Sequence, residues 1–217
     1  MSEAANALLS LAPVIPVISI EEIEVAVPLA NALVAGGLKV LEITLRTPRG
    51  LEAIALIRKQ VPEAIVGAGT ITNRVELERA ILADSHFVVT PGLTPELLVA
   101  GARCEIPFIP GVATASELMS CLDAGLNTLK FFPAESSGGA GALKAFAGPF
   151  PTVSFCPTGG ISPSNLANYL SIPTVKTVGG TWLTPKALII RRDWDAITQL
   201  AQQACELVES IRKNQQV

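Results

Sequence analysis

Histidine is almost absent from this sequence, since His86 is the only one among 217 residues. A single imidazole cannot supply a histidine-rich metal site. His86 lies in the turn ADSHF, at the entry to an apolar run, and a Ser–His catalytic pair would have to be built there. We interpret His86 as a loop residue without a catalytic task, and we expect neither a metal site nor a cofactor.

Cysteine is also scarce. Cys104, Cys121, Cys156 and Cys205 are widely scattered, form no C-x-x-C pair and have no histidine nearby. Disulfide frameworks and zinc sites need tighter, patterned spacing. We therefore expect four reduced thiols that fill gaps in the core.

The chain lacks both a strong charge excess and a long apolar segment. Its net charge of −3 and pI near 5.3 give no electrostatic reason to expect nucleic acid or an anionic membrane as a partner. The apolar stretch 8–20 is broken by Pro13 and Pro16 and is too short to span a bilayer. The N-terminus has no basic segment typical of a secretory signal. We expect a cytoplasmic protein without nucleic-acid or membrane partners.

Eight short apolar runs do occur, and segments with helical spacing separate them. Parallel strands buried on both faces give such continuous runs, and eight strand–helix units in this length predict a (β/α)8 TIM barrel. No linker or charge run divides the chain, so we predict one α/β domain over residues 1–217. A short helix over about 2–12 would close the bottom of the barrel. The runs cover 14–20, 39–46, 64–70, 87–92, 107–112, 128–134, 153–160 and 175–180.

Two of these runs carry charged side chains inside the apolar pattern. Side chains alternate along a strand, so Glu42, Thr44 and Arg46 share one face, and Lys130 lies mid-strand in TLKFF. The aliphatic faces would pack on the helices, which points the polar faces into the barrel. Buried charges are expensive unless they are paired or used. Glu42 and Arg46 alone are equally consistent with a structural ion pair and with a catalytic site. The inward orientation of Lys130 favours the catalytic site.

Paired glycines end the last two runs. Gly159 and Gly160 follow the seventh run, and Gly179 and Gly180 follow the eighth. Barrels commonly bind phosphate at these two strand ends through backbone N–H groups. Tight turns also require glycine, so one pair would be weak evidence. Two pairs at consecutive strand ends predict a phosphate site.

Seven segments, in the same order, resemble those of the 2-keto-3-deoxy-6-phosphogluconate (KDPG) and 4-hydroxy-2-oxoglutarate aldolases. The resemblance runs from about residue 14 to 185. It implies a class I pyruvate aldolase, free of metal and cofactor and usually a homotrimer, that acts on a small keto acid. It assigns Lys130 as the Schiff-base lysine and Glu42 as the proton-transferring carboxylate. The segments are VLEITLRT, VGAGTI, TPGLT, IPGVAT, LKFFPAE, FCPTGGIS and VGGTWL.

The same resemblance implies a binding role for further residues. Arg46 and Thr70 would bind the pyruvate moiety, and Thr158 would influence which face of the aldehyde reacts. The family's usual serine after the eighth strand is replaced here by Thr181, which keeps the hydroxyl and adds a methyl group. The implied substrate-binding residues are Arg46, Thr70, Pro91, Phe132 and Thr158, and the implied phosphate-binding residues are Gly159, Gly160, Gly179, Gly180 and Thr181.

Several functions remain open at this point. Within aldol chemistry, the preferred substrate is KDPG, its galactonate epimer or 4-hydroxy-2-oxoglutarate. A phosphosugar isomerase or epimerase barrel would instead use Glu42 as a base and Lys130 as an electrostatic anchor. A non-catalytic carrier would hold pyridoxal phosphate on Lys130. The residues alone do not decide among these alternatives.

Overall fold

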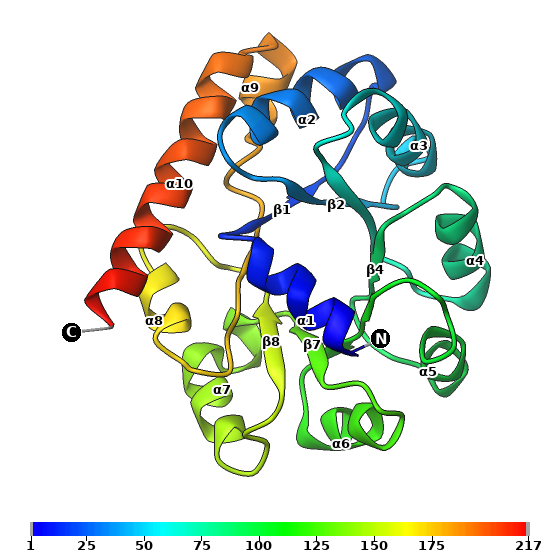
Figure 1. The fold of residues 1–217 in the computed structure, drawn as a ribbon, viewed down its shortest axis with the longest axis vertical. Coiled ribbons are helices and arrows are strands. Elements are labelled where there is room, and N and C mark those ends of the chain that lie inside the picture. The colour runs from blue at the N-terminus through cyan, green and yellow to red at the C-terminus, as the bar shows by residue number, and fades with distance from the viewer. Residues whose placement is uncertain (1, 216–217) are drawn as a thin grey trace.

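The computed structural model describes residues 2–215, in which short parallel strands alternate with helices (Figure 1). The strands are β1 Ile15–Ile18, β2 Val40–Thr44, β3 Ile65–Gly69, β4 Phe87–Val89, β5 Phe108–Ile109, β6 Gly111–Val112, β7 Thr128–Phe131, β8 Ser154–Pro157 and β9 Gly179–Gly180. The helices are α1 Ser2–Leu11, α2 Ala26–Ala35, α3 Gly50–Gln60, α4 Arg74–Leu82, α5 Pro95–Gly101, α6 Ala115–Asp123, α7 Gly139–Ala147, α8 Leu166–Leu170, α9 Lys186–Arg191 and α10 Trp194–Asn214, with 3-10 turns η1 Ile23–Val25 and η2 Glu135–Ser137.

The strands form a curled parallel sheet in two parts. One part has the order β5-β4-β3-β2-β1-β9, and the other has the order β6-β7-β8. Pro110 separates β5 from β6, so the predicted run 107–112 is interrupted. Isolated bridges join Phe155 to Val175 and Thr158 to Gly179. In Figure 1 the strands surround α1, and the other labelled helices lie around the outside.

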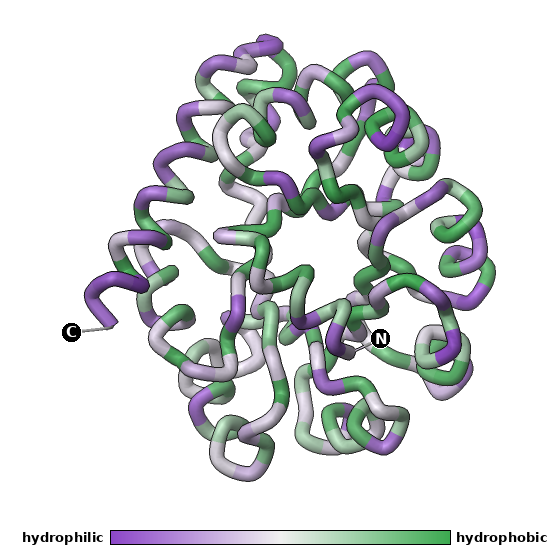
Figure 2. The backbone as a smooth tube through the Cα atoms, viewed as in Figure 1, coloured by the Kyte–Doolittle hydropathy of each residue, from purple (hydrophilic) through white to green (hydrophobic). Residues whose placement is uncertain are grey.

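Two layers of apolar side chains hold this arrangement together. The larger layer lies between the strands and the surrounding helices. The smaller layer lies inside the curled sheet, where α1 packs against the inward side chains of the strands. Figure 2 shows hydrophobic residues along the inner segments and hydrophilic residues on the outer turns of the helices. The inner layer consists of Ala5, Leu8, Leu9, Ala12, Ile15, Val40, Phe87, Val89, Ile109 and Cys156.

Side-chain caps begin three of the helices that follow strands. Asn73 and Thr94 accept hydrogen bonds from backbone N–H groups in the first turns of α4 and α5. Thr114 and Glu117 form a reciprocal capping box at the start of α6. These caps fix where each loop ends. Among the described residues, no helix is long and apolar enough to cross a membrane.

Candidate active site

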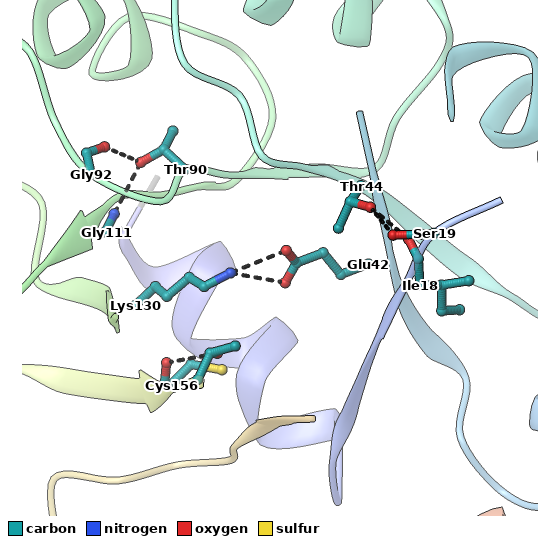
Figure 3. Close-up of polar contacts among 10 residues, drawn as sticks. Ile18, Ser19, Glu42, Thr44, Thr90, Gly92, Gly111, Lys130 and Cys156 are labelled. Atoms are coloured by element: carbon teal, nitrogen blue, oxygen red, sulfur yellow. Dashed lines mark hydrogen bonds and ion pairs between the residues drawn. The ribbon is translucent and has the colours of Figure 1, made fainter. Parts of the chain in front are cut away.

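Lys130 and Glu42 meet inside the curled sheet (Figure 3). Lys130 comes from β7 and Glu42 from β2, and the Lys130 Nζ lies 3.1 Å from Glu42 Oε1 and 3.4 Å from Oε2. Their side chains are only 5% and 4% exposed. Among the ion pairs of residues 2–215, this is the one in which both partners are buried. A buried amine in direct contact with a carboxylate is a candidate for proton transfer.

Glycines lie opposite both members of this pair, and another glycine makes room for Glu42. Glu42 lies opposite Gly67 in the pairing of β2 with β3, and a side chain at Gly69 would overlap the Glu42 carboxylate. Lys130 lies opposite Gly111 in the pairing of β6 with β7. Each charged residue therefore has a glycine as a strand partner. Only Gly69 leaves the space that the Glu42 carboxylate occupies, because side chains at Gly67 and Gly111 would overlap Phe87 and Pro91 instead.

An apolar ring and a buried thiol border the amine. Lys130 Nζ lies 5.3 Å from the centroid of the Phe132 ring, within range of a cation–π interaction. Cys156 is opposite Lys130 in the pairing of β7 with β8, and burial raises the pKa of its thiol to about 12. The thiol therefore stays protonated at neutral pH and is a weak nucleophile, so Lys130 remains the candidate nucleophile of this region.

A hydroxyl pair links β2, the strand that carries Glu42, to the end of the neighbouring strand β1. Thr44 ends β2, is fully buried, and donates a hydrogen bond to the Ile18 carbonyl oxygen at 2.9 Å. The Ser19 Oγ lies 2.9 Å from the Thr44 Oγ1. Ser19 follows β1 and is half-buried. Sequence reasoning placed Thr44 on the inward face and missed Ser19, although Ser19 continues the alternation of Ile15 and Val17.

A cavity of about 500 Å³ opens beside this hydroxyl pair. Arg46 and Thr181, both predicted to bind substrate, line it together with Val17, Ser19 and Lys186. Arg46 is exposed in this structure and lies at the cavity wall, whereas the direct partner of Lys130 is Glu42. The two predicted anion-binding residues, Arg46 and Thr181, thus share one cavity. The structure does not bring Arg46 into contact with Lys130.

Thr70 and Pro91 lie just beyond the ends of β3 and β4. Thr70 has φ of 62°, a left-handed conformation that is unusual for a β-branched residue and costs about 1–3 kcal/mol. Pro91 is held in its turn by Thr90, whose hydroxyl donates to the Gly92 oxygen at 2.6 Å and accepts from the Gly111 N–H at 3.0 Å. This second bond ties the turn to β6, the neighbour of the Lys130 strand.

The first glycine pair, Gly159 and Gly160, forms a turn with φ of 105° and 77°. The Glu135 N–H donates to the Gly159 oxygen at 3.1 Å, and the Asn165 Nδ2 donates to the Gly160 oxygen at 3.0 Å. In a trans peptide the N–H points away from the preceding carbonyl. The N–H groups of Gly160 and Ile161 therefore point away from these partners. Successive N–H groups in such a turn form an anion-binding concavity.

The second glycine pair has a different structure. Gly179 and Gly180 form β9, which pairs with β1, and Gly179 also bridges to Thr158. A side chain at Gly179 would overlap Thr158, and one at Gly180 would overlap the Trp182 ring. Close packing within the protein is sufficient to require glycine at both positions. The two pairs looked equivalent in the sequence, and only the first is a turn.

Thr158 and two residues that sequence reasoning missed support the first glycine turn. Thr158 is buried after β8, and its N–H donates to the Phe131 oxygen at 2.9 Å. The Tyr169 hydroxyl donates a hydrogen bond to the Glu135 carboxylate. Burial and this carboxylate raise the pKa of Tyr169. The position of Glu135 directly after LKFFPA was a usable signal, whereas Tyr169 gave none.

The comparisons with known proteins agree on one family. The family described as KDPG and KHG aldolase matches residues 5–200, where KHG denotes 2-keto-4-hydroxyglutarate. The KHG/KDPG aldolase of Escherichia coli (strain K12) is 52% identical over 203 residues, which cover 94% of this chain and 95% of that one.

Two solved structures are similar in both sequence and fold. The KDPG aldolase of Legionella pneumophila, with pyruvate captured as a covalent carbinolamine intermediate, has 48% identity and a TM-score of 0.90. The alignment covers 92% of this chain and 97% of that one. The KDPG aldolase of Zymomonas mobilis ZM4 with 3-phosphoglycerate has the same identity and TM-score, with coverage of 94% and 96%.

Proposed function

The chain belongs to the KDPG and KHG aldolase family and is a class I aldolase, a carbon–carbon lyase, and on this premise we propose that it cleaves KDPG to pyruvate and glyceraldehyde 3-phosphate. The observation that carries the proposal is the buried contact between Lys130 Nζ and the Glu42 carboxylate. Class I chemistry needs a lysine amine that can lose its proton and attack a ketone. The adjacent carboxylate can accept that proton.

The proposed reaction begins with this pair. Glu42 takes a proton from Lys130, and the neutral amine attacks C2 of the keto acid. Glu42 returns this proton to the carbinolamine hydroxyl, which leaves as water, so that Glu42 is a carboxylate again and an iminium forms. The iminium can accept the electron pair of the C3–C4 bond. Glu42, through a water, removes the C4 hydroxyl proton while that bond breaks, and glyceraldehyde 3-phosphate leaves. The enamine is protonated at C3, and hydrolysis releases pyruvate and restores Lys130.

Residues at the strand ends would bind the substrate carboxylate and form the apolar walls of the site. A guanidinium can bind a carboxylate through two parallel hydrogen bonds, which supports Arg46 as the carboxylate-binding residue. The left-handed backbone of Thr70 supports a role in binding pyruvate, because such strain is concentrated at functional sites. Pro91 and Phe132 would contact the substrate carbons. Thr158 would contact the aldehyde portion and influence which face reacts.

The phosphate would lie between the two glycine pairs. The amides near Gly159 and Gly160 point away from their carbonyl partners, which supports an anion contact there. Thr181 lines the cavity and offers a hydroxyl. Gly179 and Gly180, which lie in β9 immediately before Thr181, would allow close approach of the ligand to the backbone.

The finer architecture and the biological setting are also proposals. Counting β5 and β6 as one strand, with the bridge from Thr158 to Gly179 as the closing contact, supports one closed (β/α)8 barrel domain. The family resemblance supports a homotrimer that acts on a small keto acid without metal or cofactor. The net charge of −3 supports the absence of nucleic-acid and anionic-membrane partners, and we propose a cytoplasmic location. Large apolar side chains exposed on α4 and α5, including Leu82 and Val99, support burial of surface in an oligomer.

A cleavage assay with three substrates tests the proposal. Pyruvate release is measured from KDPG, from 2-dehydro-3-deoxy-6-phosphogalactonate and from 4-hydroxy-2-oxoglutarate, with the Lys130→Arg variant as control. We expect the highest kcat/KM for KDPG and no turnover in the variant, because arginine stays protonated. A higher kcat/KM for either other substrate would overturn the substrate assignment. Unchanged turnover in the variant would overturn the Schiff-base mechanism.

A further inference from the structure

The hydroxyl pair formed by Ser19 and Thr44 has a defined donor and acceptor. Each hydroxyl carries one proton and two lone pairs, whereas a carbonyl oxygen can only accept. The Thr44 proton is directed to the Ile18 carbonyl, so Thr44 has only lone pairs left for Ser19. Ser19 must therefore donate its proton to Thr44. The remaining lone pairs of Ser19 Oγ are then available only as acceptors.

Ser19 follows the strand that neighbours the Glu42 strand, two residues beyond the level of Glu42. Val17 is paired with Glu42 and Ile18 with Ile43 in the register of β1 and β2. Ser19 thus lies about 6.6 Å along the strands from the level of Glu42, because each strand residue advances the chain by about 3.3 Å. In Figure 3 Glu42 lies between the hydroxyl pair and Lys130. Ser19 is half-buried and lines the 500 Å³ cavity.

The other polar residues at this part of the cavity differ from Ser19 in what they can offer. Arg46 and Lys186 carry only donors, and the Thr181 hydroxyl can donate or accept. These groups suit the carboxylate and phosphate ends of a substrate. Glu21 and Glu22 also line the cavity, but their carboxylates are exposed, whereas Ser19 is half-buried at the end of β1. An oxygen fixed as an acceptor suits neither anion, because its lone pairs would face negative charge. It suits a hydroxyl proton.

We propose that Ser19 is a specificity-determining residue whose Oγ accepts a hydrogen bond from the C5 hydroxyl of the phosphosugar acid. This inference rests on the proposed function. The C4 hydroxyl must lie near Glu42, which takes its proton, and the phosphate lies farther out near Thr181. Ser19 lies two residues beyond the level of Glu42 and lines the same cavity as Thr181, which corresponds to the carbon between them. In 4-hydroxy-2-oxoglutarate that carbon is a carboxylate, which the Ser19 lone pairs disfavour.

The test measures the reverse reaction, the aldol addition of pyruvate to an aldehyde. It removes the Ser19 hydroxyl from the protein or the corresponding hydroxyl from the aldehyde. Saturating pyruvate is combined with glyceraldehyde 3-phosphate or with 3-phosphonooxypropanal, which lacks the hydroxyl that becomes the C5 hydroxyl. For Ser19→Ala we expect kcat/KM for glyceraldehyde 3-phosphate to fall by about 2- to 12-fold, the range for one neutral hydrogen bond. The fall for the deoxy aldehyde should be less than about twofold, because it has no proton to donate.

Two further variants support the reading of this experiment. Ser19→Thr keeps the hydroxyl and should restore most of the preference for glyceraldehyde 3-phosphate. Ser171→Ala removes an exposed hydroxyl that bonds only the Asn168 oxygen, and it should change neither rate. Equal losses on the two aldehydes in Ser19→Ala, or no loss on either, would overturn the inference.

The failure of this inference can be told apart from failure of the proposed function. Pyruvate and borohydride are applied to the wild-type protein, and the modified lysine is mapped. A reduced adduct on Lys130 together with equal aldehyde losses in Ser19→Ala would refute only the role of Ser19. Absence of the adduct from wild-type Lys130 would refute the mechanism on which that role rests.

Discussion

The inner face of the curled sheet has two halves that are built from the same strands and differ in chemistry. β2 contributes to both, since Val40 belongs to the inner apolar layer and Glu42 and Thr44 lie beyond it. In the half nearest α1, side chains such as Leu9 and Phe87 are fully buried and apolar. In the other half, Glu42 pairs with Lys130. A spacing of two residues along β2, from Val40 to Glu42, leads from the packed core to the candidate site.

This difference shows how the two halves depend on each other. The apolar half fills the space beneath the ion pair and excludes water from that side, because Leu8 and Leu9 of α1 pack against the strands there. A low-dielectric surrounding strengthens the interaction between the amine and the carboxylate. In the half that holds Glu42 and Lys130, buried charged residues lower the stability of the fold unless they are paired. Substitutions in the two halves should therefore separate activity from stability.

Removing the carboxylate from the polar half should have the largest effect. Glu42→Gln keeps the shape of the side chain and removes its ability to accept a proton. We expect proton transfer to slow by about 10²- to 10⁴-fold, the usual range for general acid–base catalysis. The measurement is deuterium exchange at the pyruvate methyl group, followed by NMR, and Schiff-base formation should be affected less.

The control for this prediction is Glu63→Gln, which alters an exposed carboxylate outside the curled sheet. It should exchange deuterium at the wild-type rate. Normal exchange in Glu42→Gln would mean that another group carries the proton.

Truncation in the apolar half should affect stability instead. Leu9 is 0% exposed and packs inside the sheet, so Leu9→Ala leaves a cavity and should lower the free energy of unfolding by about 2–5 kcal/mol. Denaturant unfolding measures this loss, and kcat of the folded fraction should stay close to wild type. Leu11→Ala, at a position that is 65% exposed, is the matched control. A large loss of kcat without a loss of stability would contradict the division between the halves.

A change at the rim of the polar half should discriminate between substrates. Thr181→Val keeps the branched shape and deletes the hydroxyl. Hydrogen bonds to charged groups contribute about 1.5–3 kcal/mol, so kcat/KM for KDPG should fall by about 10- to 150-fold. Cleavage of 4-hydroxy-2-oxoglutarate, which has no phosphate, should fall much less.

Thr184→Val provides the comparison for this substitution, because Thr184 lines the same cavity. We expect Thr184→Val to lower kcat/KM for KDPG less than Thr181→Val does. Equal losses on both substrates in Thr181→Val would place the phosphate elsewhere.

The smallest effect should come from His86, which lies outside both halves. Burial lowers its pKa below the ordinary 6.5, and its Nδ1 accepts a hydrogen bond from the Val66 N–H. The unfolded chain therefore binds a proton more readily than the folded chain as the pH falls below about 6.5. Stability should be constant above that pH and should decrease below it. Unfolding measured from pH 7.5 to 5 should show a weaker decrease in His86→Asn, and an unchanged slope would contradict the assignment.

Alternation along strands made much of this molecule predictable. The inward orientation of Glu42 and Lys130 follows from a period of two, and the apolar runs gave the α/β class and the parallel strands. Helix α1 was expected close to where it occurs. The separation of β5 from β6 was not expected, although Pro110 cannot donate a ladder hydrogen bond.

The finer arrangement of the site depends on contacts that no local pattern contains. The contact between Lys130 and Glu42 joins residues 88 positions apart, and it follows from how the sheet curls. Gly159 and Gly179 look alike in the sequence, yet one adopts a positive φ and the other lies in a ladder. The role of Ser19 depends on the direction of one proton, which Thr44 and the Ile18 carbonyl decide.

Covalent trapping of pyruvate tests the central claim most directly. The protein is incubated with pyruvate and borohydride, and the reduced adduct is located by peptide mass mapping. The account predicts one adduct, on Lys130, because that amine alone combines burial inside the sheet with contact to a carboxylate among the described lysines. An adduct on Lys176, or on any other lysine in place of Lys130, would contradict it.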